Sequence, residues 1–200
     1  MNRQTRAVRR LCVFCGSKTG YREIYVEAAR RLAACAIEAD WEIVYGGGSV
    51  GLMGVVADAA LACGGRVIGV IPERLATEEL AHGKITKLIV VKSMHERKAT
   101  MMQLSHAFAA LPGGYGTLEE LFEVVSWAQL GIHHNPIGLL NVGGYFDHLV
   151  EFIDHAVAEG FLKPEYREMI IVRSEPDELL AALRSAVPPH LPRKLGVEET

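Results

Sequence analysis

Glycines and carboxylates lie close together in one short segment of this 200-residue chain, LPGGYGTLEEL, which spans positions 111–121. Glycines at three of the four positions 113–116 permit backbone geometries and close ligand approach that a side chain would block. Thr117 is the expected N-cap of a helix whose first turn holds Glu119 and Glu120. Because the first N–H groups of such a helix lack partners, the segment predicts a phosphate site.

The two glutamates of this segment have two interpretations. A carboxylate in the first turn of a helix is favoured by the helix dipole, by about 0.3–1 kcal/mol. Alternatively, a carboxylate beside a phosphate site reaches the ribose of a bound nucleotide, where it orients water or stabilises the positive charge that develops as a glycosidic bond breaks. Glu119 and Glu120 project about 100° apart on a helix, so both cannot face the same ligand.

Arg97 and Lys98 follow a predicted strand and lie near the start of a helix, where positive charge opposes the helix dipole. This unfavourable placement indicates a phosphate or carboxylate partner, although a solvated basic pair is the alternative. A Schiff-base role for Lys98 finds no accompanying signal for pyridoxal phosphate. His95 and Glu96 do not form H-E-x-x-H, and we expect neither a metal nor another cofactor.

The elements that must position these residues alternate along the chain as short apolar strands and amphipathic helices. Predicted strands lie near 10–17, 41–48, 66–72, 87–93, 106–114, 135–144 and 167–174. Helices are expected at 22–39 and 51–63, from 94 onward, and at 117–131. Continuous apolar strands that alternate with helices predict an α/β fold: a single doubly wound, Rossmann-like domain over residues 1–186 with a mainly parallel sheet and helices on both faces. The proline-rich residues 187–200 are expected to form a flexible tail.

Composition limits the classes of partner. With 50% hydrophobic residues, a net charge of −3 and scattered basic residues, the chain has no feature of a nucleic-acid or membrane-surface protein. No signal peptide or membrane span is recognisable, and four cysteines without a disulfide-rich pattern fit the cytoplasm. Cys12 and Cys15 form C-x-x-C, but within a strand this spacing sends the thiols to opposite faces, which favours buried structural thiols over redox chemistry.

Ligands of doubly wound sheets bind beyond the carboxyl ends of the strands. Besides the segments already described, two predicted strand ends carry glycines, and we expect them to contribute to phosphate binding. The residues are Gly16, Ser17, Gly47 and Gly48.

A dinucleotide site is an alternative for the second of these strand ends. Residues 46–51 match G-x-G-x-x-G, and Glu73 follows the next strand. However, this turn follows the second strand of the domain, Pro72 interrupts the strand before Glu73, and the glycines at 113–116 would have no role. A mononucleotide could use both turns. A P-loop is excluded because GSKTG lacks the required spacing.

The paired motifs SMHERKATM (93–101) and LPGGYGTLEEL resemble those of the "lonely guy" family of cytokinin riboside 5'-monophosphate phosphoribohydrolases, long labelled lysine decarboxylases. The resemblance extends over nearly the whole chain, including YGGGSVGLMG and SWAQLGIHHNPIGLLNVGGYFDHL. It implies a homodimeric, Rossmann-like, cofactor-free hydrolase. Such an enzyme cleaves the N-glycosidic bond of cytokinin riboside 5'-monophosphates, and of AMP, to free base and ribose 5-phosphate.

The family pattern implies that Glu120 is catalytic, with Arg97 as its catalytic partner. Ser126 stands where the family commonly has threonine, which keeps the hydroxyl. The substrate-lining residues implied by the resemblance are Glu79, Arg97, Lys98, Gly113, Gly114, Tyr115, Gly116, Thr117, Leu118, Glu119, Glu120 and Ser126.

Two functional alternatives remain open: a nucleotide-binding or carrier protein without catalysis, and a nucleotide nucleosidase of broader base preference. The helix after Thr117 bears on quaternary structure, because it is apolar at too many positions for a half-exposed helix. We therefore expect it to be wholly buried or packed against a second subunit. Its apolar residues are Leu118, Leu121, Phe122, Val124, Val125 and Trp127.

Overall fold

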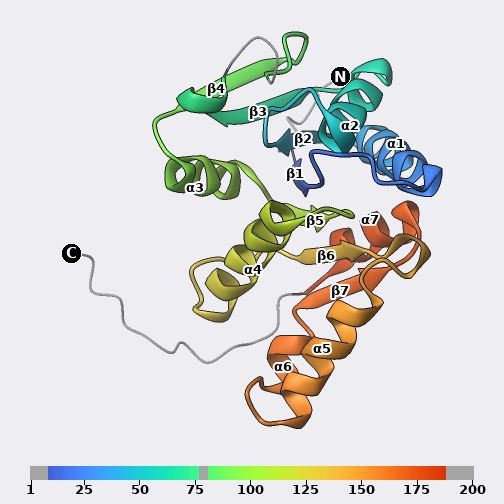
Figure 1. Cartoon of the computed structure of the whole chain (residues 1–200), viewed down its shortest axis with the longest axis vertical. Coiled ribbons are helices and arrows are strands. Elements are labelled where there is room, and N and C mark those ends of the chain that lie inside the picture. The colour runs from blue at the N-terminus through green and yellow to red at the C-terminus, as the bar shows by residue number, and fades with distance from the viewer. Residues whose placement is uncertain (1–8, 77–80, 188–200) are drawn as a thin grey trace, which may run out of the picture.

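The computed structural model describes residues 9–76 and 81–187. Its strands form one sheet in which every pairing is parallel, in the order β4-β3-β2-β1-β5-β6-β7 (Figure 1). The strands are β1 (Arg9–Phe14), β2 (Trp41–Tyr45), β3 (Val67–Pro72), β4 (Lys87–Val91), β5 (Ala107–Ala110), β6 (Ile137–Leu140) and β7 (Ile170–Arg173). Six lie within segments that the sequence predicts as strands, and β1 begins one residue before its predicted segment 10–17; the predicted fold class is confirmed.

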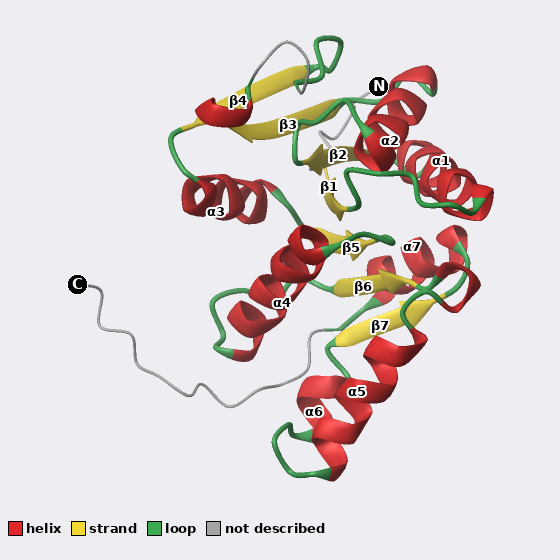
Figure 2. Cartoon of the chain, viewed as in Figure 1, coloured by secondary structure: helices red, strands yellow, loops and turns green. Residues whose placement is uncertain are grey.

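Helices cover both faces of the sheet. They are α1 (Glu23–Glu38), α2 (Gly51–Ala62), α3 (Met94–Leu104), α4 (Tyr115–Gln129), α5 (Asp147–Ala158), α6 (Pro164–Arg167) and α7 (Pro176–Ser185), with short 3₁₀ turns η1 (Glu73–Leu75) and η2 (Val142–Gly144). Buried residues of α1, α2 and α7 share one core layer, and those of α3, α4, α5 and α6 share the other. Figure 2 shows the sheet between these two groups of helices. No helix of the described segments is long and apolar enough to cross a membrane.

The central strand β1 shows how the two layers arise. Its side chains alternate, so that Leu11 and Val13 enter the layer of α1 and α2, whereas Cys12 and Phe14 enter the layer of α3 and α4. Cys15 lies with Leu11 and Val13, so the two thiols of C-x-x-C are on opposite faces, as strand geometry predicts. Burial raises the pKa of both thiols, and each is free. Their position supports a structural role.

The strand order places a topological switch point between β1 and β5. The chain proceeds from β1 outward to β2, β3 and β4, and then returns to add β5 on the other side of β1. The loops that follow β1 and β5 therefore lead away in opposite directions and leave a crevice at the carboxyl edge, where ligands of such sheets bind. The predicted tail at 187–200 lies outside the described residues, apart from Val187.

Candidate active site

The start of α3 is fixed by a reciprocal cap. Ser93 is the N-cap residue, and its Oγ accepts the N–H of Glu96 at 3.1 Å. The Glu96 carboxylate in turn accepts the N–H of Lys92 at 2.7 Å. This arrangement is a variant of the capping box, in which two unpaired backbone donors at a helix start are satisfied. It places Arg97 and Lys98 at the end of the first turn of α3.

Arg97 lies across the ends of two neighbouring strands. Its Nε donates to the carbonyl of Val70 at 3.0 Å, and its Nη2 donates to the carbonyl of Gly46 at 3.2 Å. A Cβ at position 46 would lie 2.0 Å from Arg97 Nη2, so the glycine makes room for the guanidinium. With only 11% of its side chain exposed, Arg97 presents a charge in a fixed position. The predicted need for a partner at Arg97 is thus met by two carbonyls and by a carboxylate.

That carboxylate is Glu120. Its Oε1 lies 3.5 Å from Arg97 Nη1, and its side chain is likewise 11% exposed. Burial raises the pKa of Glu120 from 4.5 to about 7, although the neighbouring charge of Arg97 favours the ionised form and opposes the rise. A carboxyl group with this pKa exchanges protons near neutral pH, which suits general acid–base catalysis.

Lys98 forms a second, separate set of ion pairs with α4. Its Nζ lies 2.9 Å from Glu123 Oε1 and also contacts the Glu119 carboxylate. Burial lowers the pKa of Lys98, but the hydrogen bonds to these two carboxylates outweigh it, and the net shift is upward. The ambiguity between the two adjacent glutamates therefore has a geometric answer: Glu119 pairs with Lys98, and Glu120 with Arg97.

The prediction of Thr117 as N-cap is wrong by one turn. α4 begins at Tyr115 with Gly114 as its N-cap, and Leu118 N–H donates to the Gly114 carbonyl at 3.1 Å. Glycine accommodates the N-cap position without a side-chain signal, which is why the sequence points to the threonine instead. Thr117 is buried against Gly113, where a Cβ would lie 2.1 Å from Thr117 Oγ1. Glu119 and Glu120 consequently lie in the second turn.

A pocket of about 280 Å³ opens beside this helix start, at the switch point. The loop after β1 meets the turn after β5, because Gly16 N–H donates to the Pro112 carbonyl at 3.0 Å. The predicted residues Gly16, Ser17, Gly113 and Gly114 all line it. The N–H groups of the first turn of α4, at Tyr115, Gly116 and Thr117, have no carbonyl partner within the helix.

Tyr145, which is not among the predicted site residues, also lines this pocket. Tyr145 lies just after η2, and its hydroxyl donates to the Gly113 carbonyl at 2.6 Å. Its ring packs edge-on against Tyr25 of α1, a second lining residue. Tyr145 falls within the stretch 126–149 that carries part of the family resemblance, but no spacing marks either tyrosine as a site residue, and only the strand order brings them to Gly113.

Among the predicted residues that the structure describes, Gly16, Ser17, Gly113 and Gly114 line this pocket, whereas Arg97, Lys98, residues 115–120, Gly47, Gly48 and Ser126 do not. Gly47 and Gly48 are buried after β2, where Gly47 has a φ of +77° and Gly48 pairs with Ala81 in an isolated antiparallel bridge. Ser126 is exposed on α4, six residues after Glu120, about 9 Å along the axis and 240° around it. Glu79 lies outside the described residues.

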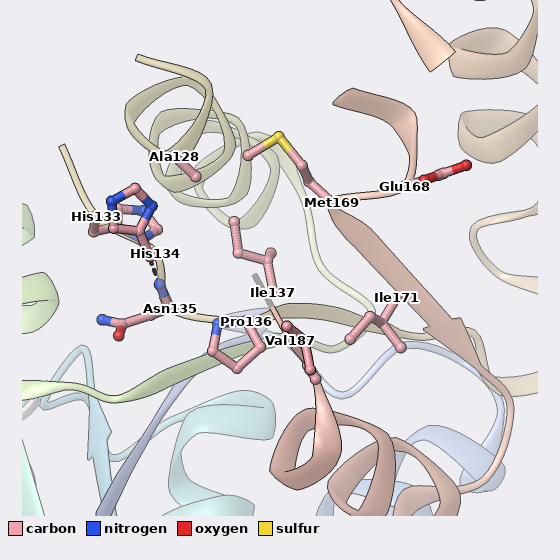
Figure 3. Close-up of a pocket in the computed structure, with 11 residues that line it drawn as sticks. Ala128, His133, His134, Asn135, Pro136, Ile137, Glu168, Met169, Ile171 and Val187 are labelled. Atoms are coloured by element: carbon pink, nitrogen blue, oxygen red, sulfur yellow. Dashed lines mark hydrogen bonds between the residues drawn. The ribbon is translucent and has the colours of Figure 1, made fainter. Parts of the chain in front are cut away.

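A smaller cavity of about 50 Å³ lies at the opposite, amino edge of the sheet, before β6 and β7 (Figure 3). Ile137, Met169 and Ile171 form apolar walls, and His133 lies at its rim. The His133 ring is fully bonded: Nε2 is 2.8 Å from the Val124 carbonyl, and Nδ1 accepts the N–H of Asn135 at 3.2 Å. Of these two cavities, the one at the carboxyl edge is larger and is lined by Gly113 and Gly114. Within residues 9–76 and 81–187, no cluster of His, Cys, Asp or Glu is arranged to hold a metal ion.

Comparison with known proteins assigns the family. Residues 53–183 match the protein family described as "Possible lysine decarboxylase". The chain is 51% identical over 182 residues to "Probable cytokinin riboside 5'-monophosphate phosphoribohydrolase LOGL2" of Oryza sativa subsp. japonica, covering 91% of this chain and 75% of the relative. The chain belongs to the cytokinin riboside 5'-monophosphate phosphoribohydrolase family. A further member, LOG5 of Arabidopsis thaliana, is 50% identical over 180 residues, covering 90% of this chain and 79% of that protein.

Solved structures of lower identity share the fold of this phosphoribohydrolase family. The molybdenum cofactor carrier protein of Chlamydomonas reinhardtii superposes with a TM-score of 0.68 at 21% identity, over 88% of this chain and 96% of that one. The molybdenum cofactor binding protein of Rippkaea orientalis gives a TM-score of 0.69 at 19% identity, over 91% and 98%. At these identities the likeness concerns the fold alone.

Proposed function

We propose that this protein hydrolyses the N-glycosidic bond of cytokinin riboside 5'-monophosphates, and of AMP, to release the free base and ribose 5-phosphate. The observation that carries the proposal is the buried Arg97–Glu120 pair, in which Glu120 lies on α4, the helix whose N-cap residue Gly114 lines the pocket at the switch point. Family membership supports the same reaction, because the relatives named above are phosphoribohydrolases.

In the proposed mechanism, Glu120 acts at the ribose. Its ionised carboxylate stabilises the positive charge that develops at C1′ as the bond to the base breaks, and the electron pair of that bond leaves with the base nitrogen. A water molecule adds its oxygen to C1′ and gives a proton to Glu120, whose pKa of about 7 permits both uptake and release of the proton. That proton passes to the base, so that the enzyme returns to its initial state.

Arg97 keeps Glu120 in the reactive state. Because two strand carbonyls hold the guanidinium, its charge stays beside the carboxylate and favours ionisation against the cost of burial. The same fixed charge also lies in a position to stabilise negative charge on the substrate. Such preorganised charge requires no rearrangement during the reaction.

The 5'-phosphate is proposed to bind at the start of α4. The free N–H groups of Tyr115, Gly116 and Thr117 point out of the helix end, and the helix dipole favours an anion there. The alternative of a carrier without catalysis would use the same cradle. Carboxyl groups whose pKa burial raises toward neutrality, as it does for Glu120, cluster at catalytic sites, which favours the enzyme.

We further propose a homodimer. α4 is neither wholly buried nor polar on its outer face, since Phe122 and Leu130 are 39% and 47% exposed, and Ile132 just beyond is 56% exposed. Ser126 lies on this same face, where it contacts the substrate only if the face meets a partner subunit. Sedimentation of a Phe122→Arg variant as a monomer, against a dimeric wild-type protein, supports this assembly, whereas a monomeric wild-type protein contradicts it. The four free cysteines support the prediction of a cytoplasmic location.

One chromatographic assay tests the function. The protein is incubated with AMP, adenosine and isopentenyladenosine 5'-monophosphate, and released base is measured. We expect base from both monophosphates and none from adenosine, because adenosine has no group for the helix start. A ratio near one between the two monophosphates favours the broader nucleosidase. Bound nucleotide without released base refutes the hydrolase and supports the carrier.

A further inference from the structure

A buried histidine bonds the segment before β4 to the turn that follows β2, Gly46–Gly48. His82 is 6% exposed, and its backbone N–H donates to the Gly47 carbonyl at 3.0 Å. The neighbouring Ala81 pairs with Gly48 in the antiparallel bridge. Two successive residues of the turn are therefore held by backbone contacts from a segment more than thirty positions away along the chain.

The His82 ring is itself held from two sides. Its Nε2 lies 3.1 Å from Asp58 Oδ1 on α2, and its Nδ1 accepts the N–H of Lys84 at 3.3 Å. An Nδ1 that accepts leaves the proton on Nε2, which then donates to Asp58. Asp58 is on the exposed side of its helix, with 70% of its side chain accessible, so it serves the histidine without being part of the core.

His82 is bonded to Gly47, the residue next to Gly46, and Gly46 binds Arg97. The turn begins at Gly46, whose carbonyl accepts Arg97 Nη2, and its next residue is bonded to His82. The turn has little freedom on its other side, because a Cβ at Gly69 of β3 would lie 2.7 Å from the Cα of Gly47. A shift of the turn therefore moves the Gly46 carbonyl and with it the guanidinium.

We propose that His82, oriented by Asp58, is a positioning residue for the reaction: it fixes the turn at Gly46–Gly48 and thereby the Arg97 guanidinium against Glu120. The inference rests on the proposed function of that pair. His82 does not touch the substrate pocket; it acts through a backbone carbonyl. A misplacement of about 1 Å by a distant substitution costs as much as 10²-fold in rate.

The structure offers a matched control at the other edge of the sheet. His133 bonds in the same pattern as His82, with Nδ1 accepting the N–H two residues on and Nε2 bonded to an oxygen of another segment (Figure 3 shows its Nδ1 bond). It lies before β6 and bonds to α4 at Val124, one turn beyond Glu120, and it makes no bond to Arg97 or to the turn at Gly46–Gly48, all of which the structure describes. A His133→Ala variant therefore reports the cost of removing a bonded histidine from a loop that does not contact this turn.

The test compares His82→Ala, Asp58→Ala, His82→Gln and His133→Ala in steady-state kinetics with a nucleoside monophosphate. We expect kcat to fall about 10-fold to 10²-fold in His82→Ala, with KM changed much less. The kcat of Asp58→Ala should also fall, by a smaller factor. His82→Gln, whose amide can donate to Asp58, should recover part of the loss. His133→Ala should keep kcat.

A pH profile distinguishes positioning from general loosening of the fold. If Arg97 moves away from Glu120, the carboxyl loses a neighbour that favours its ionised form, and the acidic limb of kcat/KM moves to higher pH. Gly46→Ala displaces Arg97 by direct contact and should move the limb in the same direction. If His82→Ala leaves both kcat and the pH of the acidic limb of kcat/KM unchanged, the inference is overturned.

A second measurement does not depend on turnover. Arginine-selective NMR follows hydrogen exchange of the Arg97 Nε–H that is bonded to Val70. We expect faster exchange in His82→Ala and unchanged exchange in His133→Ala. If the wild-type protein releases no base, the proposed function fails, and this exchange experiment still decides the positioning role: equal protection in both variants and the wild-type protein overturns it.

Discussion

Two sets of ion pairs join α3 to α4, one made by Arg97 and the other by the next residue, Lys98. The two sets differ in how far their partners are buried. Arg97 and Glu120 are each 11% exposed, and the arginine is also bonded to two strand carbonyls. Lys98 is 10% exposed, but its partners Glu119 and Glu123 are 53% and 19% exposed. The first set holds a carboxyl group whose pKa is raised to about 7. The second neutralises a buried ammonium with carboxylates that reach solvent.

The difference in burial and partners indicates that the Arg97–Glu120 pair is the one suited to catalysis. A lysine shared by two carboxylates that reach solvent is an ordinary way to join two helices, and either carboxylate can replace the other as its partner. A buried carboxyl with one ion-pair partner has less redundancy, because burial works against its charge and the charge of Arg97 is the largest effect that opposes that cost. We expect substitutions in the two sets to differ by orders of magnitude in activity.

The largest expected effect is that of Glu120→Gln on turnover. The amide keeps the shape of the side chain but can neither carry the negative charge nor accept a proton, so kcat should fall by about 10²–10⁴-fold. Release of base from AMP measures it, and circular dichroism confirms the fold. Wild-type turnover in this variant would exclude Glu120 as the catalytic carboxylate.

Arg97→Met should lower kcat by about 10²–10³-fold, the usual effect of losing one preorganised charge. The variant also removes the neighbour that favours ionised Glu120, so the pKa of Glu120 rises above 7. Because the reaction requires the carboxylate, the acidic limb of kcat/KM moves to higher pH. An acidic limb that stays in place would show that Arg97 does not act on Glu120.

Some of this site was predictable from sequence and some was not. Apolar runs within the predicted strands 106–114 and 135–144 indicated buried parallel strands, and these indicated the edge at which ligands bind. Arg97 and Glu120 stood out because each follows a strand and a helix start. The true cap, Gly114, gave no signal, since a glycine N-cap has no side chain to recognise.

Contacts between distant segments were beyond such reasoning. His82 and Asp58 are 24 positions apart, and neither lies in a motif. Tyr145 reaches Gly113 across 32 positions, and only the order of strands around the switch point brings the two together. Local pattern predicts elements, whereas which loops meet depends on the assembled sheet.

Glu120 should also make the free energy of unfolding depend on pH, by an amount on the order of 1–3 kcal/mol. Its pKa is raised in the folded protein, so the folded state binds more protons than the unfolded state between pH 4.5 and about 7. The contribution of Glu120 is therefore present below pH 4.5 and lost as pH rises through 7. The neutral Glu120→Gln variant should gain stability relative to the wild-type protein over this range, measured by urea unfolding at each pH. A constant difference would contradict the raised pKa.

The smallest effect is expected for Glu119→Gln, one position away. Glu119 is half-exposed, and when its charge is removed Lys98 still lies 2.9 Å from Glu123, so the buried ammonium keeps a partner. Exposed ion pairs contribute about 0–1 kcal/mol, and the free energy of unfolding should change by roughly 0.5 kcal/mol or less. Turnover should stay within about threefold of wild type, in contrast to Glu120→Gln. A loss comparable to that of Glu120→Gln would mean that Lys98 and Glu119 act in the reaction together, and that the division between the two ion-pair sets is mistaken.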